Sequence, residues 1–354
     1  MAASPTVLIV GAGPAGFTTA AELARRGLVP TVVDAREGVA EISRAVGITP
    51  RSLEYLAPSG ASEPLIEAAL LPANMIIYRG SRMAASYPLH SDTAFHPSLL
   101  FMPQATAESI LGDRLHAHGA AVTRGRAVVG LDGEGPYEVS FSDGSQAEFD
   151  LVIGADGTQS TVRAAAGIPF EGYDLPGHWS IGEVSAEGWP HPGDFAVSLT
   201  PQGIAVIVPL GDGIYRLVAN APDAVAAMAL PMNVTSVLRT CEFTISVRQA
   251  ARYQSGGIFL AGDAAHTFSP IGGRGMNVAI ADGAVLAESI ACGRPGEFAR
   301  DRHAAGRRVI RDTEIARRMM TGENWAARLM MRAVLGLSAI PPVSRRLGRF
   351  GVEF

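Results

Sequence analysis

The sequence IFLAGDAAHTFSPIGGRGMNVAIADG, residues 258–283, decides how the rest of the chain is arranged. Its first four residues are an apolar run that predicts a buried strand, and Asp263 follows that strand almost at once. Open α/β sheets bind ligands at the carboxyl ends of such strands. Glycines then precede an Ala-rich segment, Met276 to about Ala291, which predicts a helix whose positive end faces the ligand. A carboxylate followed by a helix start suits the polyol and electron-poor ring of a flavin better than any smaller ligand.

A second motif, TVLIVGAGPAGFTTAAELARRGLVPTVVD, spans residues 6–34. It predicts a buried strand, a glycine turn, a helix over 17–27, and a second strand that ends at an acid. The first glycine allows the tight turn, the second lets a diphosphate approach the helix start, and the third lets helix and strand pack closely. The acid can accept a hydrogen bond from a ribose hydroxyl. The motif fits NAD as well as FAD, and its expected contacts are Gly11, Gly13, Pro14, Ala15, Gly16 and Asp34.

Residues 43–56, SRAVGITPRSLEYL, resemble the segment R-A-x-G-x-x-P-R-[ST]-L-E of class A flavoprotein monooxygenases, the relatives of para-hydroxybenzoate hydroxylase. Residues 99–115 are similar to the Q-x-x-x-E-x-x-L helix of that family, and residues 150–163 to its fingerprint G-A-D-G-x-x-S-x-V-R. The opening stretch is similar to the pattern G-D-A-A-H-x-x-x-P-x-x-G-x-G-x-N. These segments occur in the order of the family and cover most of the chain.

The resemblance implies FAD as the cofactor, with NADPH or NADH as a transient co-substrate. In the family an arginine and a glutamine reach the FAD, a valine packs by the adenine, and the second fingerprint serves FAD and the NAD(P)H route. The strand-end acid binds the ribityl chain, a proline lies beside the ring, and backbone groups at the last helix start contact its pyrimidine edge. The positions carried over are Arg44, Gln104, Val128, Asp156, Arg163, Asp263, Pro270, Gly275, Met276 and Asn277.

Between residues 170 and 256 the strands alternate or run apolar and are separated by Gly-containing turns, which predicts an antiparallel meander that roofs the flavin ring. The predicted fold is α/β, a Rossmann-like FAD-binding domain of the glutathione-reductase type with an inserted antiparallel β-sheet substrate domain and C-terminal helices. The FAD-binding domain should comprise 1–72, 99–172 and 255–299, the substrate domain 73–98 and 173–254, and the helical segment 300–354. Candidate pocket residues, which can equally be plain core, are Phe195, Leu199, Val206, Val208 and Tyr215.

Composition excludes several classes of protein. A net charge of -5 in 354 residues argues against a nucleic-acid partner. All 29 basic residues are Arg, so no mechanism can use a catalytic lysine. Two cysteines, Cys241 and Cys292, are too few for a disulfide framework or a zinc site. The sequence lacks a signal peptide pattern and an apolar run of about 18 residues, so we expect a cytoplasmic protein that does not enter the membrane.

The reaction implied by the resemblance is FAD-dependent, NAD(P)H-consuming hydroxylation of a phenolic or polyketide-like small molecule, through a flavin C4a-hydroperoxide formed with O₂. No residue of the sequence identifies itself as the base that would activate the substrate. Two alternatives stay open: a flavin-dependent reductase or desaturase of the geranylgeranyl-reductase kind, and a protein that uses FAD as a non-redox scaffold for cyclisation. The sequence leaves the oligomeric state undetermined.

Overall fold

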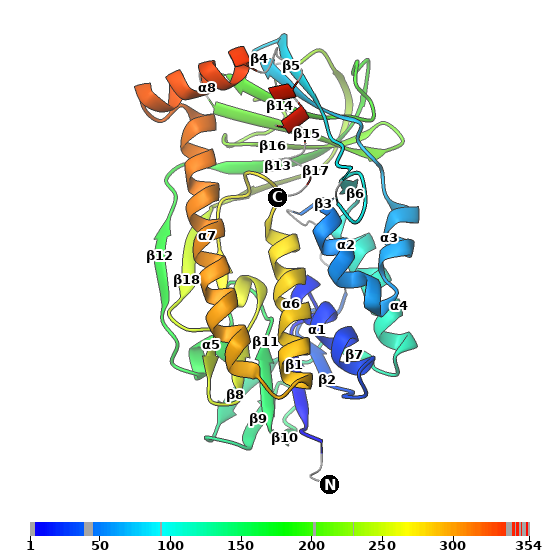
Figure 1. Ribbon diagram of the computed structural model, residues 1–354, viewed down its shortest axis with the longest axis vertical. Helices are drawn as coiled ribbons and strands as arrows, with labels where there is room; N and C mark the ends of the chain where they lie inside the picture. The colour runs from blue at the N-terminus through cyan, green and yellow to red at the C-terminus, as the bar shows by residue number, and fades with distance from the viewer. Residues whose placement is uncertain are drawn as a thin grey trace.

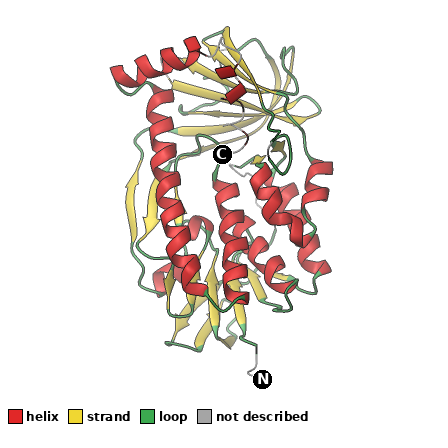
Figure 2. Ribbon diagram, in the orientation of Figure 1, coloured by secondary structure: helices red, strands yellow, loops and turns green. Residues whose placement is uncertain are grey.

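The computed structural model describes residues 4–38, 45–92, 94–200, 203–228 and 230–337, together with residues 342, 343, 345, 346, 348 and 352. One large sheet lies in the lower half of Figure 1, behind α1 and α6, and a second fills the upper end of the molecule. Long helices connect the two regions, and Figure 2 shows them in front of the lower strands. The architecture is the predicted α/β fold with two sheets and C-terminal helices, so the predicted fold class is confirmed.

The lower sheet has six strands in the order β19-β20-β11-β1-β2-β7. Every neighbouring pair is parallel except β19 and β20. Val10 lies opposite Val33 and Gly154, and Gly154 lies opposite Leu260, so four central strands end level at one edge. Their side chains are nearly all buried, as expected of a sheet covered on both faces. The bounds are β1 Val7–Val10, β2 Thr31–Asp34, β7 Val122–Arg124, β11 Leu151–Gly154, β19 Gln254–Ser255 and β20 Ile258–Leu260.

The helices follow the predictions, with differences at their ends. The first helix begins at Pro14 rather than Phe17, because proline at the first helical position already has a helical φ. The boundary predicted between residues 299 and 300 falls inside a helix that begins at Pro295. The bounds are α1 Pro14–Ala24, α2 Pro50–Leu56, α3 Ser62–Ala68, α4 Gln104–Ala117, α5 Thr161–Ala165, α6 Gly275–Ala291, α7 Pro295–Thr321 and α8 Trp325–Leu337, with 3-10 turns η1 Ala57–Ser59 and η2 Gly262–Ala264.

The upper sheet has seven strands in the order β17-β13-β16-β15-β14-β4-β5. It is antiparallel, as predicted, except where β4 and β14 pair in parallel. β4 comes from an earlier stretch of the chain and runs beside β14 in the same direction. The bounds are β4 Asn74–Arg79, β5 Arg82–Pro88, β13 Trp179–Glu187, β14 Phe195–Thr200, β15 Gly203–Gly211, β16 Ile214–Ala219 and β17 Asn233–Phe243.

Three small sheets complete the fold. The ends of the predicted meander do not join the upper sheet, because β12 and β18 pair with β21 instead. The bounds are β12 Phe170–Asp174, β18 Ser246–Ala250 and β21 His266–Thr267; β8 Val128–Asp132, β9 Tyr137–Phe141 and β10 Gln146–Phe149; and the pair β3 Gly47–Ile48 and β6 Leu100–Phe101. The division of the chain into domains stays a prediction. None of the described helices is both long and apolar enough to cross a membrane.

Candidate functional site

The level edge of the lower sheet brings the sequence fingerprints together. Gly11 follows β1, Asp156 comes shortly after β11, and Asp263 comes shortly after β20. Gly11 has a φ of 103°, and a Cβ atom there would lie 2.3 Å from the carbonyl oxygen of Ala155. The first glycine turn therefore packs directly against the second fingerprint, and only glycine can occupy this position.

The other two glycines of the first motif have different roles. A Cβ atom at Gly16 would lie 1.9 Å from the carbonyl oxygen of Gly11, so close packing of helix and strand requires glycine there. A Cβ atom at Gly13 would have no atom within 4 Å. Gly13 is the N-cap of α1, and no side chain caps the helix at this end. No residue among those that the structure describes therefore blocks the positive end of α1, as a site for a diphosphate requires.

The starts of α1 and α6 lie at different heights above the sheet edge. A Cβ atom at Gly283 would lie 2.6 Å from the carbonyl oxygen of Ala15, and one at Gly262 would lie 3.0 Å from the Ala15 Cβ atom. Gly283 follows Gly275 by two helical turns, so α6 begins about 12 Å beyond α1. Figure 1 shows α6 reaching further towards the upper sheet than α1 does. The exposed Asp263 belongs to the turn between the two helix starts.

The start of α6 has no side-chain cap, and its approach is open as far as the described residues are concerned. Gly272 and Gly273 have φ values of 90° and 61°, a conformation that favours glycine. A Cβ atom at Gly273 or Gly275 would have no atom within 4 Å. No side chain caps the helix, and its first helical hydrogen bond is donated by Val278 to Arg274. The N–H groups of residues 275–277 therefore have no acceptor within the helix, which leaves them for a ligand.

The side chain of Asn277 makes a complete set of hydrogen bonds within the protein. Its Oδ1 atom accepts from the Thr49 N–H at 2.8 Å and from the Ser52 hydroxyl at 2.7 Å. Its Nδ2 atom donates to the carbonyl oxygens of Gly47 and Gly273, both at 3.0 Å. Asn277 thus joins the start of α6 to residues 47–52, and only its backbone remains for the predicted contact with a ring.

Asp34, the predicted ribose acceptor, is already engaged. Its carboxylate accepts from the Ala12 N–H at 2.8 Å, from the Arg36 N–H at 2.8 Å, and from the Arg36 guanidinium at 2.9 and 3.1 Å. Burial opposes ionisation, but the bonds from Arg36 and Ala12 outweigh it and lower the pKa of the Asp34 carboxyl. A ribose hydroxyl would have to displace Arg36, which the sequence reasoning missed although it stands only two positions after the acid.

Gln104 contacts a buried carboxyl group. Its Nε2 atom donates to Oε1 of Glu108 at 2.7 Å, one turn further along α4. Glu108 is 1% exposed, and burial raises its pKa although Gln104 and the nearby Arg36 favour the ion. Arg36 NH1 lies 3.8 Å from Glu108 Oε2, so Arg36 connects this carboxyl group to Asp34. The predicted contact of Gln104 with FAD stays a prediction.

The second fingerprint is tied to the third by Arg163. Its guanidinium donates to the carbonyl oxygens of Thr158 at 2.7 Å and Ala264 at 2.9 Å, and it stacks on the ring of Phe170. This side chain therefore holds the Asp263 turn against the end of β11. Asp156 accepts from the Val162 N–H at 3.1 Å, and burial raises its pKa because the hydrogen bonds do not offset the loss of water.

A buried ionic network between α6 and α7 supports the turn that carries Asp263. Asp282, which is fully buried, accepts from the Gly262 N–H at 3.0 Å, from His266 Nε2 at 2.6 Å, and from Arg302 Nε at 2.6 Å. Burial opposes the charge of Asp282, but Arg302 and His266 outweigh it, and its pKa lies below the ordinary value. His266 therefore helps to hold this turn through its hydrogen bond to Asp282. Asp282 and Arg302 were not identified from the sequence, since nothing local indicates that residues on α6 and α7 meet.

Three predicted contacts cannot be assigned from the geometry. Arg44 lies outside the described residues. Val128 is 6% exposed and packs in the main core, two positions after Arg126, whose N–H donates to the Asp34 carbonyl oxygen. Pro270 begins the turn into α6, where its carbonyl oxygen accepts from the Gly273 N–H at 2.9 Å. Their roles stay predictions.

The upper sheet presents an apolar face to this region. Val197 lies opposite Val206, so the odd-numbered residues of β14 share a face with the even-numbered residues of β15. Ile271, which follows Pro270, packs on this face, and the Phe101 and Phe195 rings lie 5.7 Å apart. The predicted residues on it are Phe195, Leu199, Val206 and Val208, whereas Tyr215 lies in the core cluster of the opposite face.

An ion pair interrupts this apolar face. Arg216 is 2% exposed and pairs with Glu183 on the neighbouring strand, while Arg239 lies 4.0 Å from the same carboxylate. Arg216 lies opposite Val208, so the pair is on the face that carries the candidate pocket residues. Its guanidinium also donates to the carbonyl oxygen of Ala45 at 3.4 Å. Burying a charged pair in an apolar surface costs desolvation energy, so the pair contributes little to stability. Its presence on this face makes it a candidate for substrate contact.

The chemistry of the edge fits a dinucleotide with a flat ring at one end. It offers one uncapped helix start for a diphosphate and a second, about 12 Å beyond, for the electron-poor ring. An exposed carboxylate between them can accept from a polyol. Glycines stand at both helix starts, and a Cβ atom at Gly13, Gly273 or Gly275 would contact no described residue.

Comparison with known proteins agrees with this chemistry. A family model described as an FAD binding domain matches residues 4–218 and 216–308. Rifampicin monooxygenase of Streptomyces venezuelae is 32% identical over 346 residues, which cover 90% of this chain and 72% of that protein. The crystal structure of p-nitrophenol 4-monooxygenase from Pseudomonas putida has the same fold, with a TM-score of 0.87 at 22% identity over 98% of this chain and 97% of that one. A Diels–Alderase from the biosynthetic pathway of pyrroindomycins has a TM-score of 0.82 at 26% identity, covering 98% of this chain and 80% of that one.

Proposed function

This chain belongs to the family of proteins with an FAD binding domain, and we propose that it is a monooxygenase that uses NAD(P)H and O₂ to hydroxylate a phenolic or polyketide-like small molecule. The observation that carries the proposal is the pair of uncapped helix starts with Asp263 between them. Rifampicin, the compound in the name of the relative at 32% identity, supports a polyketide-like substrate. Free cysteines at positions 241 and 292 are in keeping with a cytoplasmic location.

Each part of the edge would hold one part of the cofactor. The space at Gly13 would take the diphosphate, Asp263 the ribityl hydroxyls, and the N–H groups at the start of α6 the pyrimidine edge of the ring. Bound FAD supplies the redox chemistry, the transfer of electrons from NAD(P)H to O₂ and the oxygenation of an electron-rich carbon. Asp282 accepts a hydrogen bond from the Gly262 N–H, and Arg163 donates one to the Ala264 carbonyl oxygen, so both hold the turn that carries Asp263.

The upper sheet would hold the substrate over the ring. Its apolar face, with Phe195, Val206 and Ile271, excludes water and contacts an aromatic skeleton. Glu183, held by Arg216, is a carboxylate on this face and would accept a hydrogen bond or a proton from a substrate hydroxyl. This proposal gives a role to the Arg216–Glu183 ion pair, whose burial costs desolvation energy.

The test is oxidation of NADPH and NADH by the FAD-loaded protein with a panel of phenols and aromatic polyketides. We expect at least one compound to accelerate oxidation and to gain a single oxygen atom, as measured by mass spectrometry with ¹⁸O₂. Protein that binds FAD and oxidises no nicotinamide nucleotide with any compound would contradict the proposal.

A non-redox role is the second candidate, favoured by the likeness to the Diels–Alderase at 26% identity. In that role FAD would shape the pocket and a linear polyene would cyclise without a change of mass. The two candidates separate in one experiment, because cyclisation proceeds without NADPH and O₂ and continues after both are removed.

A further inference from the structure

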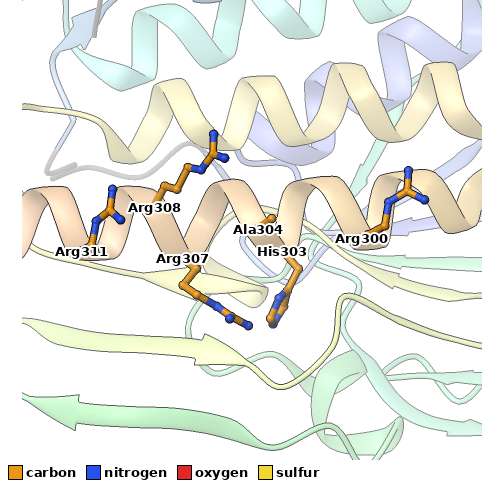
Figure 3. A pocket seen from close by; sticks show the side chains of 6 residues that line it. All are labelled: Arg300, His303, Ala304, Arg307, Arg308 and Arg311. Carbon is orange, nitrogen blue, oxygen red and sulfur yellow. The ribbon is translucent and has the colours of Figure 1, made fainter.

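The exposed side of α7 carries a concave, positively charged surface away from the edge described above. A hollow of about 340 Å³ is lined by Arg300, His303, Ala304, Arg307, Arg308 and Arg311, which we call the cationic groove. In the view of Figure 3, His303 and Arg307 point downward from α7 and the other three arginines point upward, with Ala304 between them along the helix. A second hollow, lined by residues 251–254 and Gly296 among others, shares Arg300 and His303 and extends the groove.

Helical periodicity explains why the groove is concave and elongated. Residues 300, 304, 307, 308 and 311 recur at intervals of three and four, so they lie on one side of α7. The methyl group of Ala304 forms a floor between longer side chains of the turns on either side. From Arg300 to Arg311 the helix rises about 16 Å. An anion with charges spread along its length fits this surface better than a single phosphate does.

The positive charge of the groove is only partly neutralised. Arg300 and Arg311 each pair with the acid that follows it in sequence, at 2.8 and 3.0 Å. Within the described part of the chain, neither Arg307 nor Arg308 has a carboxylate at ion-pair distance. The whole chain has a net charge of -5, so this excess of positive charge is local. Guanidinium groups bind phosphates in a bidentate manner, which suits a phosphorylated ligand.

One end of the groove lies near the candidate redox site. Ile310, next to Arg311, packs in the same cluster as Ile271 of the turn into α6. Asp312 acts electrostatically on Arg274, the N-cap residue of α6. The other end lies at Tyr253, whose ring meets that of His303 edge to face at 5.1 Å. The Arg311 end of the groove is therefore the end nearer to the start of α6.

We propose that the cationic groove binds the phosphate groups of NADPH, with the nicotinamide end of the dinucleotide towards Arg311. The proposal rests on the proposed function, which supplies the nicotinamide nucleotide. The length of the groove favours NADPH over NADH, because the additional 2′-phosphate places charge well away from the diphosphate. Arg307 and Arg308 make the principal contacts, since they are not neutralised by neighbouring acids.

The experiment compares two double variants of the FAD-loaded protein. Arg307→Gln/Arg308→Gln removes two charges from the groove, and Arg294→Gln/Arg318→Gln removes two from exposed arginines at the two ends of the same helix, outside the lining. NADP⁺, NAD⁺ and inorganic pyrophosphate are titrated by calorimetry, and the KM for NADPH is measured where oxidation occurs. We expect the groove variant to weaken NADP⁺ binding and raise the KM at least about tenfold, the size of losing charge-assisted hydrogen bonds. The control should stay close to the unmodified protein, and FAD affinity should not change in either.

A local readout separates this proposal from the proposed function. Burial and the charge of Arg307 lower the pKa of the His303 imidazole, so an anion bound in the groove should raise it, which NMR titration with NADP⁺ detects. If the protein oxidises no NADPH, the proposed function fails, while calorimetry and the His303 titration still decide about the groove. Equal effects of the two double variants, or NADP⁺ binding no tighter than pyrophosphate, would overturn the assignment of the groove.

Discussion

Replacing Arg302 by Met tests whether the buried network behind the Asp263 turn positions that turn. The substitution keeps an unbranched side chain of similar length and removes the guanidinium that donates to Asp282 at 2.6 Å. Asp282 is fully buried, so its carboxylate then depends on the Gly262 N–H and on His266 alone. Removing one partner of a buried ion pair costs about 3–5 kcal/mol of folding free energy.

We expect a destabilisation of roughly 3 kcal/mol, near the lower limit, because the Gly262 N–H and His266 Nε2 still donate to the Asp282 carboxylate. Urea unfolding of the FAD-free protein measures the stability, and quenching of flavin fluorescence measures FAD affinity. Both should fall, since Gly262 and the Asp263 turn lose their support.

The matched control removes the charge from both partners. Asp282→Asn/Arg302→Met leaves an amide oxygen for the Gly262 N–H and no buried ion, so it should recover more than half of the stability lost by the single variant. A single variant that loses less than about 1 kcal/mol, or a double variant as unstable as the single one, would refute the reasoning. Lost stability with unchanged FAD affinity would show that the network stabilises the core without positioning the turn.

Further substitutions test other parts of the site. Gly13→Ala should fold like the unmodified protein and bind FAD at least about tenfold more weakly. Gly16→Ala should lower the melting temperature of the FAD-free protein, because its methyl group has no room. Equal melting temperatures of Gly16→Ala and the unmodified protein would count against the packing argument. Glu108→Gln should raise stability at pH 8, because burial raises the pKa of Glu108 and makes its ion unfavourable, and this gain should vanish below the ordinary carboxyl pKa near 4.5. A constant gain from pH 8 to pH 4 would exclude charge as the cause. Glu183→Gln should raise the amount of peroxide released per NADPH consumed, measured with a peroxidase-coupled assay, and should leave FAD affinity unchanged. An unchanged ratio of hydroxylated product to NADPH would show that Glu183 does not contact the substrate.

Local sequence was enough to predict the elements that bear the fingerprints. The strands before Gly11 and Asp263 are short apolar runs, and the helices after them contain small residues, so the pattern of each segment determines its structure. The spacing of glycines also predicted different roles for Gly11, Gly13 and Gly16, because each role depends on neighbours within the motif. The contacts that a Cβ atom would make agree with the packing roles of Gly11 and Gly16, and the diphosphate role of Gly13 stays a prediction.

Contacts between distant segments escaped prediction for a physical reason. Arg302 meets Asp282 only because α7 packs along α6, and a lone arginine in an Arg-rich helix carries no signal of burial. Tyr215 was grouped with Val208, but pairing sets residue 216 opposite Val208, so Tyr215 points to the other face. A shift of one residue in a strand reverses the face, and sequence spacing across a turn does not fix the register.

The arrangement of the two helix starts follows from small residues rather than from the fingerprints themselves. Ala15 on α1 touches Gly262 and Gly283, so α1, the Asp263 turn and α6 approach each other more closely than larger side chains would allow. This contact falls in the first turn of α1 but two turns inside α6, which sets the offset of about 12 Å between the helix starts. A side chain at position 283 would meet the Ala15 carbonyl oxygen and the Thr18 Cβ atom at 2.6 and 2.9 Å, pushing the helices apart and moving the second start relative to the first. We therefore expect a side chain at position 283 to weaken binding of a ligand whose diphosphate and ring are separated by a polyol, without touching that ligand.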